Sequence, residues 1–450
     1  MGRNSELQTG GLPRGVRRQW TIILALLTVV WRLVPLIRLA RESVEAAGSL
    51  GEIAYVRPFV GSGFNLVEFF LNPAISWVGS PFYLLLASIE TQLGTGGGWL
   101  LLLQVMASGV TVFTILHVGE RMLGTLAGFL AAGLWAVATP AILSPLALLP
   151  SCFLMLFTLL FVDRLHAVGH NRQQQASLGL GFWAGCLSLV SGFAALWLPA
   201  MLLWLPTMSR RFRGVDGLRV AGAICFGFFL ALSPVWLHGA IMQHDLVLPF
   251  ENAAYDLDRA ALNGDLVQRA DGEFVPYPVG RRERSILLLR QENEGSEPKA
   301  LARSAQYLGS LASRWGDDVL GQGSLLFSRA AAFFGGTISG PLLESAPTAG
   351  LFRGLPTLPT EALLILSFLG GLALLGSLRS YAPLYCAVAI PCLVGVFTGL
   401  SASVQMVSTP FLALMGGYGL ARWWEARRWP FTWIVAPLLL VAALGWVRLF

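Results

Sequence analysis

Residues 102–143 read LLQVMASGVTVFTILHVGERMLGTLAGFLAAGLWAVATPAIL, which is two long apolar runs separated by one short charged turn. Glu120 and Arg121 lie in the turn, and Gly124 closes it. A helix needs roughly 20 mostly apolar residues to cross a bilayer, because every backbone polar group in hydrocarbon must be hydrogen-bonded within the protein. The stretch therefore predicts two membrane-spanning helices joined by a hairpin turn.

The same pattern recurs along the whole chain of 450 residues, which is 55% apolar and only 12% charged. That charged share is about half of what a soluble protein uses to cover its surface. We therefore expect an all-α polytopic membrane protein with about 11 transmembrane helices. The expected spans run approximately over residues 20–37, 99–118, 123–143, 150–168, 178–193, 195–208, 218–238, 361–378, 382–400, 404–421 and 431–446.

The basic residues indicate an orientation. The net charge is +6, and Lys299 is the only lysine among 31 basic residues. With the N-terminus in the cytoplasm, the arginine clusters of the short loops between spans fall on the cytoplasmic side, as the positive-inside rule requires. This favours an odd number of crossings with the C-terminus outside. Because topology accounts for most of the arginines, nucleic acid is not an expected partner. One alternative stays open: the two segments around Pro199 are one broken helix, which would invert every later loop.

This orientation divides the chain into four parts: residues 1–19 form a cytoplasmic segment, 20–238 a transmembrane module, 239–360 a large extracytoplasmic loop, and 361–450 the C-terminal helices. The first module contains a long outer loop of its own. Long loops in a protein with short turns elsewhere are where function concentrates. Each outer loop holds a stretch suited to a helix at the membrane interface, SPFYLLLASIETQL (80–93) in the loop over 38–98 and KALARSAQYLGSLASRW (299–315) in the larger one.

Arginines near the outer end of the first span oppose the topology rule. Arg32 lies inside the span, Arg41 follows its end, and Arg57 lies in the first outer loop. One interpretation is that they bind an anionic group, such as the phosphate of a lipid-linked donor. The other is that Arg32 extends to the interface and that its neighbours pair with nearby acids or lipid headgroups.

Other polar residues of the outer loops are candidates for chemistry. Glu52, if partly desolvated near the membrane, suits a general base toward a hydroxyl; otherwise it belongs to a solvated helix face. Arg281 and Arg282 in VGRRERS suit either a phosphate clamp or attraction to anionic headgroups. The cysteines and histidines lack metal-ligand spacing, so a metal bound through them is not expected; a divalent ion held by carboxylates stays possible.

Three stretches in order carry a family resemblance: GEIAY (51–55), SPFYLLLA (80–87) and the run over 102–143. Over roughly residues 15–240 the chain resembles the GT-C fold of integral membrane glycosyltransferases, in particular the bacterial branch related to protein mannosyltransferases and the lipid A aminoarabinose transferase. The resemblance implies that a sugar moves with inversion from a polyprenyl phosphate to an acceptor on the outer face.

In that resemblance, Glu52 takes the acidic position that activates the acceptor or helps to hold a metal, and Tyr55 takes the tyrosine of the same motif. Arg281 and Arg282 are loose candidates for the donor phosphate. Gly51 stands where family members usually have aspartate, and Ser191-Gly192 replaces a common Arg-Pro pair.

These departures keep a second hypothesis open, a catalytically inactive GT-C-like subunit with membrane-protein partners. A third, a lipid or small-solute transporter, is disfavoured because ionisable residues inside the later spans are scarce. The expected partners under the first hypothesis are a polyprenyl-phosphate-linked sugar and membrane lipid.

Overall fold

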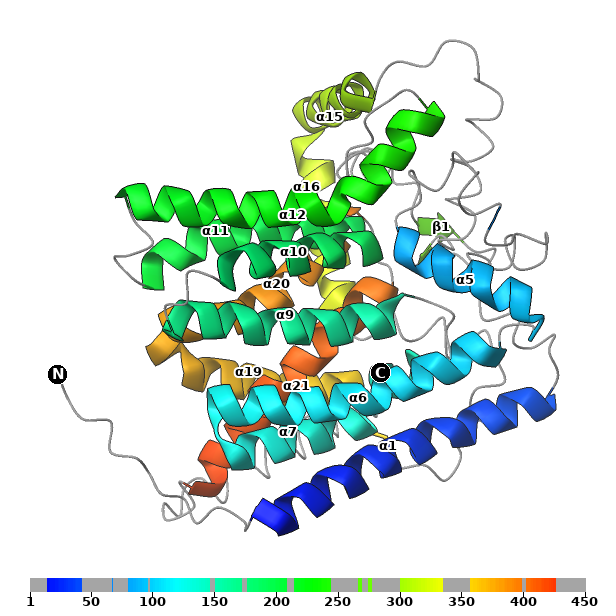
Figure 1. The fold of residues 1–450 in the computed structure, drawn as a ribbon, viewed down its shortest axis with the longest axis vertical. Coiled ribbons are helices and arrows are strands. Elements are labelled where there is room, and N and C mark those ends of the chain that lie inside the picture. Colours follow the sequence, from blue (N-terminus) through cyan, green and yellow to red (C-terminus); the bar gives the residue numbers. More distant parts are fainter. Residues whose placement is uncertain are drawn as a thin grey trace.

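The computed structural model describes residues 14–42, 67, 80–95, 98–145, 150–171, 176–208, 214–243, 266–268, 274–276, 300–334, 357–398 and 402–425. The described residues are nearly all helical, and most of the helices lie side by side (Figure 1). The helices are α1 (Arg14–Glu42), α5 (Pro81–Leu93), α6 (Gly98–Leu123), α7 (Thr125–Val137), α8 (Thr139–Leu143), α9 (Ser151–Asn171), α10 (Ala176–Val190), η3 (Gly192–Leu196), α11 (Trp197–Met208), α12 (Gly214–Gln243), α15 (Ala300–Asp317), α16 (Val319–Phe334), α19 (Thr360–Leu374), η5 (Leu375–Ser377), α20 (Leu378–Thr398) and α21 (Ala402–Glu425). Strands β1 (Leu266–Gln268) and β2 (Phe274–Pro276) form one antiparallel pair.

Among the residues that the structure describes, four segments are long and apolar enough to cross a bilayer: Gly98–Leu123, Ser151–Gly169, Gly214–Ile241 and Thr360–Phe397. This is consistent with a helical membrane protein. The last segment contains two helices rather than one, because the Tyr385 hydroxyl donates a hydrogen bond to the Gly371 carbonyl at 2.6 Å. Fourteen residues of straight helix would hold these groups about 21 Å apart. The chain therefore turns back at η5, and α19 and α20 form a hairpin.

The hairpin expected in residues 102–143 is present as α6 and α7. Gly124 turns the chain with φ of 104°, a value that glycine adopts without steric cost. Gly119 and Gly128 then bring the two helices together, since a Cβ on either glycine would overlap the backbone of the other helix. The arrangement explains why small residues recur along this stretch.

The single helix expected over 123–143 is wrong, because α7 ends at Val137 and the short α8 follows it. Ala138 between them is extended, with φ −66° and ψ 128°. Proline at position 140 has no N–H to donate to the carbonyl of Ala136, four residues earlier, so the ladder cannot continue through it. Leu358 fills part of the gap: its N–H donates to Val137 O at 2.7 Å, and its carbonyl accepts from Thr139 N at 2.9 Å.

The interpretation of the segments around Pro199 as one broken helix is excluded. In α10, Gly181 packs against Ile224 and Gly185 against Phe228 of α12, so these two helices run parallel. In α11, Trp197 meets Phe161 edge to face with ring centroids 5.1 Å apart, and Trp204 packs against Gly169, so α11 runs parallel to α9. Since α9 and α10 are antiparallel neighbours, the chain reverses direction between α10 and α11.

The directions in which these helices run place their ends at two opposite ends of the bundle. At one end of the bundle, Arg121 of α6 forms an ion pair with Asp163 of α9 at 3.0 Å, and the indole N–H of Trp204 donates to the Arg379 carbonyl of α20 at 3.0 Å. We call this the arginine end. The opposite end holds α5, the break at Ala138 and the first turn of α9, and we call it the α5 end (Figure 1).

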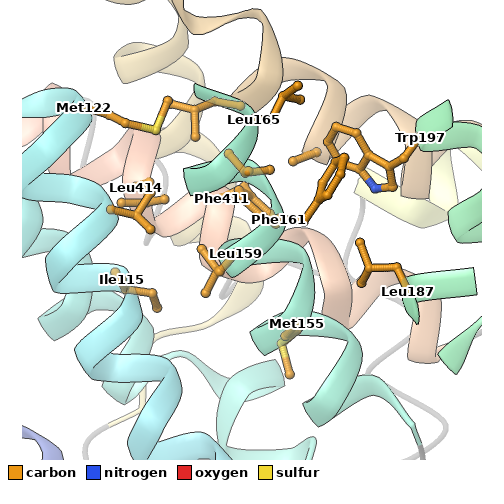
Figure 2. Close-up of a cluster of buried hydrophobic side chains, with 14 of the residues drawn as sticks. Ile115, Met122, Met155, Leu159, Phe161, Leu165, Leu187, Trp197, Phe411 and Leu414 are labelled. Carbon is orange, nitrogen blue, oxygen red and sulfur yellow. The ribbon is translucent and has the colours of Figure 1, made fainter. Parts of the chain in front are cut away.

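The apolar core lies between α6, α9, α10, α11 and α21. Ile115, Leu159, Phe161 and Phe411 are fully buried there, and Figure 2 shows these side chains facing one another around α9. Close approach of α21 to α7 and α19 relies on glycine, because a Cβ at Gly417 would overlap the backbone of α7. The core fixes α9 centrally, so that its first turn is held at the α5 end.

Both stretches expected to form short helices do so. SPFYLLLASIETQL forms α5, where the Ser80 hydroxyl accepts from Tyr83 N, Pro81 begins the helix, and Gly94 ends it in the left-handed region with φ of 66°. Its 13 residues are too few to cross a bilayer. The stretch over 299–315 forms α15. That both rest at the membrane interface stays a prediction.

Candidate functional site

The residues predicted to form the site are mostly outside the described part of the chain. Glu52, Tyr55, Arg57, Arg281 and Arg282 all lie there. Arg41 is in the last turn of α1, and its side chain is not among those described. Their juxtaposition is therefore neither confirmed nor contradicted, and what the structure does describe is the bundle of helices.

Arg32 is the most unusual side chain in that bundle. It is fully buried, with 0% of its surface exposed, and its guanidinium carbon lies 4.5 Å from the centroid of the Trp135 ring of α7. Its Nη1 donates to the carbonyls of Thr28 at 3.2 Å and Ala136 at 3.4 Å. The interpretation that Arg32 extends to the interface is wrong, because the side chain turns into the protein.

The backbone break explains one of these contacts. Ala136 O would receive an N–H from position 140 in a continuous helix, but Pro140 has none to give. Arg32 donates to that carbonyl instead. The guanidinium is thus positioned by α1, by an aromatic face of α7 and by the same proline that ends α7.

The remaining donors at Arg32 are not satisfied by the described residues. Neither Nε nor Nη2 has a hydrogen-bond partner there, and the buried indole N–H of Trp135 has none either. Within the described ranges, no carboxylate forms an ion pair with Arg32. A buried positive charge without a negatively charged partner is strongly unfavourable, so this position suits an anion or an acid from elsewhere.

Small polar groups line the neighbourhood of Arg32. Thr28 lies one turn below on α1, and its hydroxyl donates to Leu24 O at 2.8 Å. The Cys152 thiol at the start of α9 is close enough to interact with Arg32 electrostatically, and it donates to the Ser144 hydroxyl at 3.3 Å. These groups are buried and neutral, so the positive charge of Arg32 dominates the local field.

A second polar group at the α5 end was missed by sequence reasoning. Glu90 of α5 is fully buried; one carboxylate oxygen accepts from the Thr95 hydroxyl, and the other accepts from Leu100 N at 3.0 Å. Gln104 of α6 donates to the Tyr83 hydroxyl at 3.1 Å. Burial raises the pKa of Tyr83 well above its ordinary value, so its phenol stays protonated.

The hydrogen bonds of Glu90 join α5 to the start of α6. A carboxylate that accepts a backbone N–H from the first turn of α6 caps that helix and fixes its angle to α5. The signal in the sequence was an acid within an otherwise apolar stretch, followed five residues later by threonine.

Aromatic side chains fill the space between α5 and α9. Phe82 lies 5.7 Å from Phe153 and 5.7 Å from Phe157, and Tyr83 lies 6.4 Å from Phe153, all measured between ring centroids. Leu84 and Leu100 pack into the same cluster and are fully buried. This side of α5 is therefore a packed apolar contact.

In chemical terms, the described part of the α5 end offers hydrogen-bond donors and one positive charge. Within the described ranges, no group of three or more histidine, cysteine, aspartate or glutamate side chains could hold a metal ion. An arrangement of this kind is chemically complementary to an anion.

Comparison with known proteins adds no assignment: no family model and no curated protein matches the chain.

Proposed function

We propose that this protein is a membrane glycosyltransferase that moves a sugar from a polyprenyl phosphate to an acceptor at the extracytoplasmic face. In this proposal the chain is a GT-C-like protein with about 11 spans in a bacterial inner membrane. The N-terminus and the arginine end face the cytoplasm, the α5 end faces outward, and the C-terminus lies outside.

The observation that carries the proposal is the position of α5. The segment SPFYLLLA, which is similar to a segment of that family, is expected in the first outer loop as a short helix at the membrane interface, between the first span and the next hairpin. The helix α5 has that length, and it lies at the end opposite Arg121 and Arg379. The positive-inside rule predicts arginines at the cytoplasmic end of the bundle. The expected position of α5 in an outer loop predicts a non-spanning helix at the opposite end.

The mechanism assigned by the proposal is an inverting displacement. Glu52 removes the proton of the acceptor hydroxyl, the acceptor oxygen forms a bond to the anomeric carbon, and the bond from that carbon to the lipid phosphate breaks. The leaving phosphate takes the electron pair, and Arg41, Arg57, Arg281 and Arg282 stabilise its charge. Tyr55 orients the acceptor or the sugar beside Glu52.

The test uses the full chain in proteoliposomes with two synthetic donors, polyprenyl-phosphate mannose and polyprenyl-phosphate aminoarabinose, and a bacterial envelope extract as the source of acceptors. We expect the wild-type protein to release polyprenyl phosphate from one of them. Loss of a general base lowers rates by about 100-fold or more, so Glu52→Gln should nearly abolish release. Glu425→Gln, which changes an exposed acid at the arginine end, is the matched control and leaves the rate unchanged.

Two results contradict parts of the proposal separately. Absence of release from both donors by the wild-type protein overturns the transferase. Release by Glu52→Gln at the wild-type rate removes Glu52 from the mechanism while leaving the transferase in place.

A second candidate function is a catalytically inactive GT-C-like subunit of a membrane complex. The aromatic packing beneath α5 favours it, because an apolar contact occupies space in which an open substrate cavity would otherwise lie. Purification under mild detergent separates the two: a stable partner of fixed stoichiometry together with no donor turnover supports the accessory subunit.

A further inference from the structure

The geometry points to a binding site for a phosphate group at Arg32 and Trp135, inside the bundle and reached from the lipid at α1. This inference deepens the proposed function by naming where the phosphate of the lipid carrier is held, and it rests on that function only for the identity of the lipid. The ligand chemistry is a phosphate monoester or diester.

The first step of the argument is the excess of donors. Arg32 has two N–H positions, at Nε and Nη2, that meet no acceptor among the described residues, and the Trp135 indole N–H adds a third. All three are buried. Water can serve as donor or acceptor, but a set of donors around a fixed positive charge is complementary to an anion. Arginine in particular matches phosphate, because its planar fork presents two parallel N–H groups.

The second step is that the guanidinium is held in place before any ligand arrives. The Trp135 ring covers one face at 4.5 Å, and two backbone carbonyls accept from Nη1. The edge that carries Nε and Nη2 meets no acceptor among the described residues, so it is the edge to which a ligand would bond. A donor fixed in this way loses little conformational freedom on binding, which favours affinity.

The third step is access. In Figure 1 the helix α1 lies at the edge of the bundle, where it packs mainly against α6 and, to a lesser extent, α7. Its other side is apolar and exposed, with Leu26 at 60% and Val30 at 52%. Arg32 lies between α1 and α7, so a small movement of this peripheral helix opens a path from the bilayer. Pro35, one turn further, removes a hydrogen bond of α1 and eases such a movement.

A lipid is therefore the source of phosphate that this position suits. The chain of a polyprenyl phosphate can stay in the bilayer beside α1 while its head enters toward Arg32. A free phosphate ion would have to leave water and enter the apolar bundle without a lipid chain to carry it, and the experiment separates these two sources.

The experiment measures equilibrium binding of tritiated farnesyl phosphate to the full-length protein in nanodiscs. We expect saturable binding by the wild-type protein and at least about tenfold weaker binding by Arg32→Gln, since a charge-assisted pair to phosphate is lost. Arg32→Lys keeps the charge without the fork and should fall between them. Arg219→Gln, at an exposed arginine of α12, is the matched control and binds as the wild type does.

Trp135→Phe is a second variant, which tests the same site if Arg32→Gln does not fold. It keeps an aromatic ring against α1 but removes the indole N–H together with the five-membered ring, and we expect weaker binding by a protein that still folds. Farnesol, which has the same chain and no phosphate, should not compete. Competition by inorganic phosphate at equal concentration assigns the site to the free ion, whereas competition only by farnesyl phosphate assigns it to the lipid.

The inference is overturned if the wild-type protein binds no farnesyl phosphate and no inorganic phosphate, because the acceptor for Arg32 is then a residue of this chain. It is also overturned if folded Arg32→Gln binds like the wild type, or if farnesol competes as well as farnesyl phosphate. Binding of farnesyl phosphate by a protein that transfers no sugar leaves this inference standing and overturns only the transferase.

Discussion

At the scale of single residues, two arginines of this protein are held by different kinds of partner. Arg32 is buried and meets carbonyls and an aromatic face, whereas Arg121 at the other end of the bundle meets a carboxylate. Arg121 donates to both oxygens of Asp163, at 3.0 and 3.1 Å. The Asp163 side chain is 10% exposed and that of Arg121 is 35% exposed. The pair joins α6 to α9 where the core ends.

Breaking this pair tests its contribution. We expect Asp163→Asn to lower the free energy of unfolding by about 1–2 kcal/mol, which is less than for a fully buried pair, because Arg121 keeps contact with solvent. The measurement is unfolding of the purified protein in mixed detergent and SDS. Asp216→Asn, which breaks the exposed pair with Arg219 at 3.7 Å, should change stability by less than about 0.5 kcal/mol. Equal effects of the two variants would show that the ion pair at Asp163 is not a specific link.

At the scale of elements, the contacts between helices depend on where glycine lies. The parallel pair of α10 and α12 approaches closely because Gly181, Gly185 and Gly227 let backbones meet. Helices in lipid gain little from the hydrophobic effect, so close packing of this kind carries their association.

One substitution examines this contact. A Cβ on Gly181 would overlap the Ile224 carbonyl, whereas a Cβ on Gly179 in the same helix meets nothing within 4 Å. We expect Gly181→Ala to lower the free energy of unfolding by about 1–3 kcal/mol through overpacking. Gly179→Ala should leave it unchanged or raise it slightly, since alanine favours helix. If both variants unfold alike, the close packing of α10 on α12 is contradicted.

The sequence carries enough information for most elements and not for their interruptions. Ser80, Pro81 and Gly94 are local start and stop signals, and α5 begins and ends as the sequence predicts. The end of α7 at Val137 has a different cause. The backbone groups exposed by that break bond to Leu358, which lies more than 200 residues further along the chain, so local pattern cannot reveal the break.

In the candidate site, too, the sequence reveals some features and not others. An arginine inside a span is visible in the sequence, but the residue that its guanidinium faces is not, because Trp135 lies on another helix. Glu90 was overlooked because its role depends on Leu100 N, a backbone group without any side-chain signature.

At the scale of the whole molecule, the proposed orientation makes the two ends of the bundle chemically different compartments. Gly316 lies in the last turn of α15, within the large loop expected over residues 239–360, and Gly376 lies in η5 close to Arg379. A Cβ at either position meets nothing within 4 Å, so both accept cysteine without strain.

Labelling of these positions tests the orientation. In a chain whose five native cysteines are changed to alanine, we expect Gly316→Cys to react with a membrane-impermeant maleimide in intact spheroplasts. Gly376→Cys should react only after the membrane is permeabilised. Reaction of Gly376→Cys in intact spheroplasts would mean that the arginine end faces outward, against the positive-inside rule.

The account as a whole depends on a lipid phosphate reaching the α5 end of the bundle at Arg32. The most direct measurement is a cryo-electron microscopy map of the full chain in nanodiscs with farnesyl phosphate, using a bound antibody fragment as a marker. The account predicts phosphate density within hydrogen-bond distance of Arg32 Nε and Nη2, with the isoprenoid chain leaving beside α1. A carboxylate of the protein bonded to those two nitrogens, with no phosphate beside them, would contradict it.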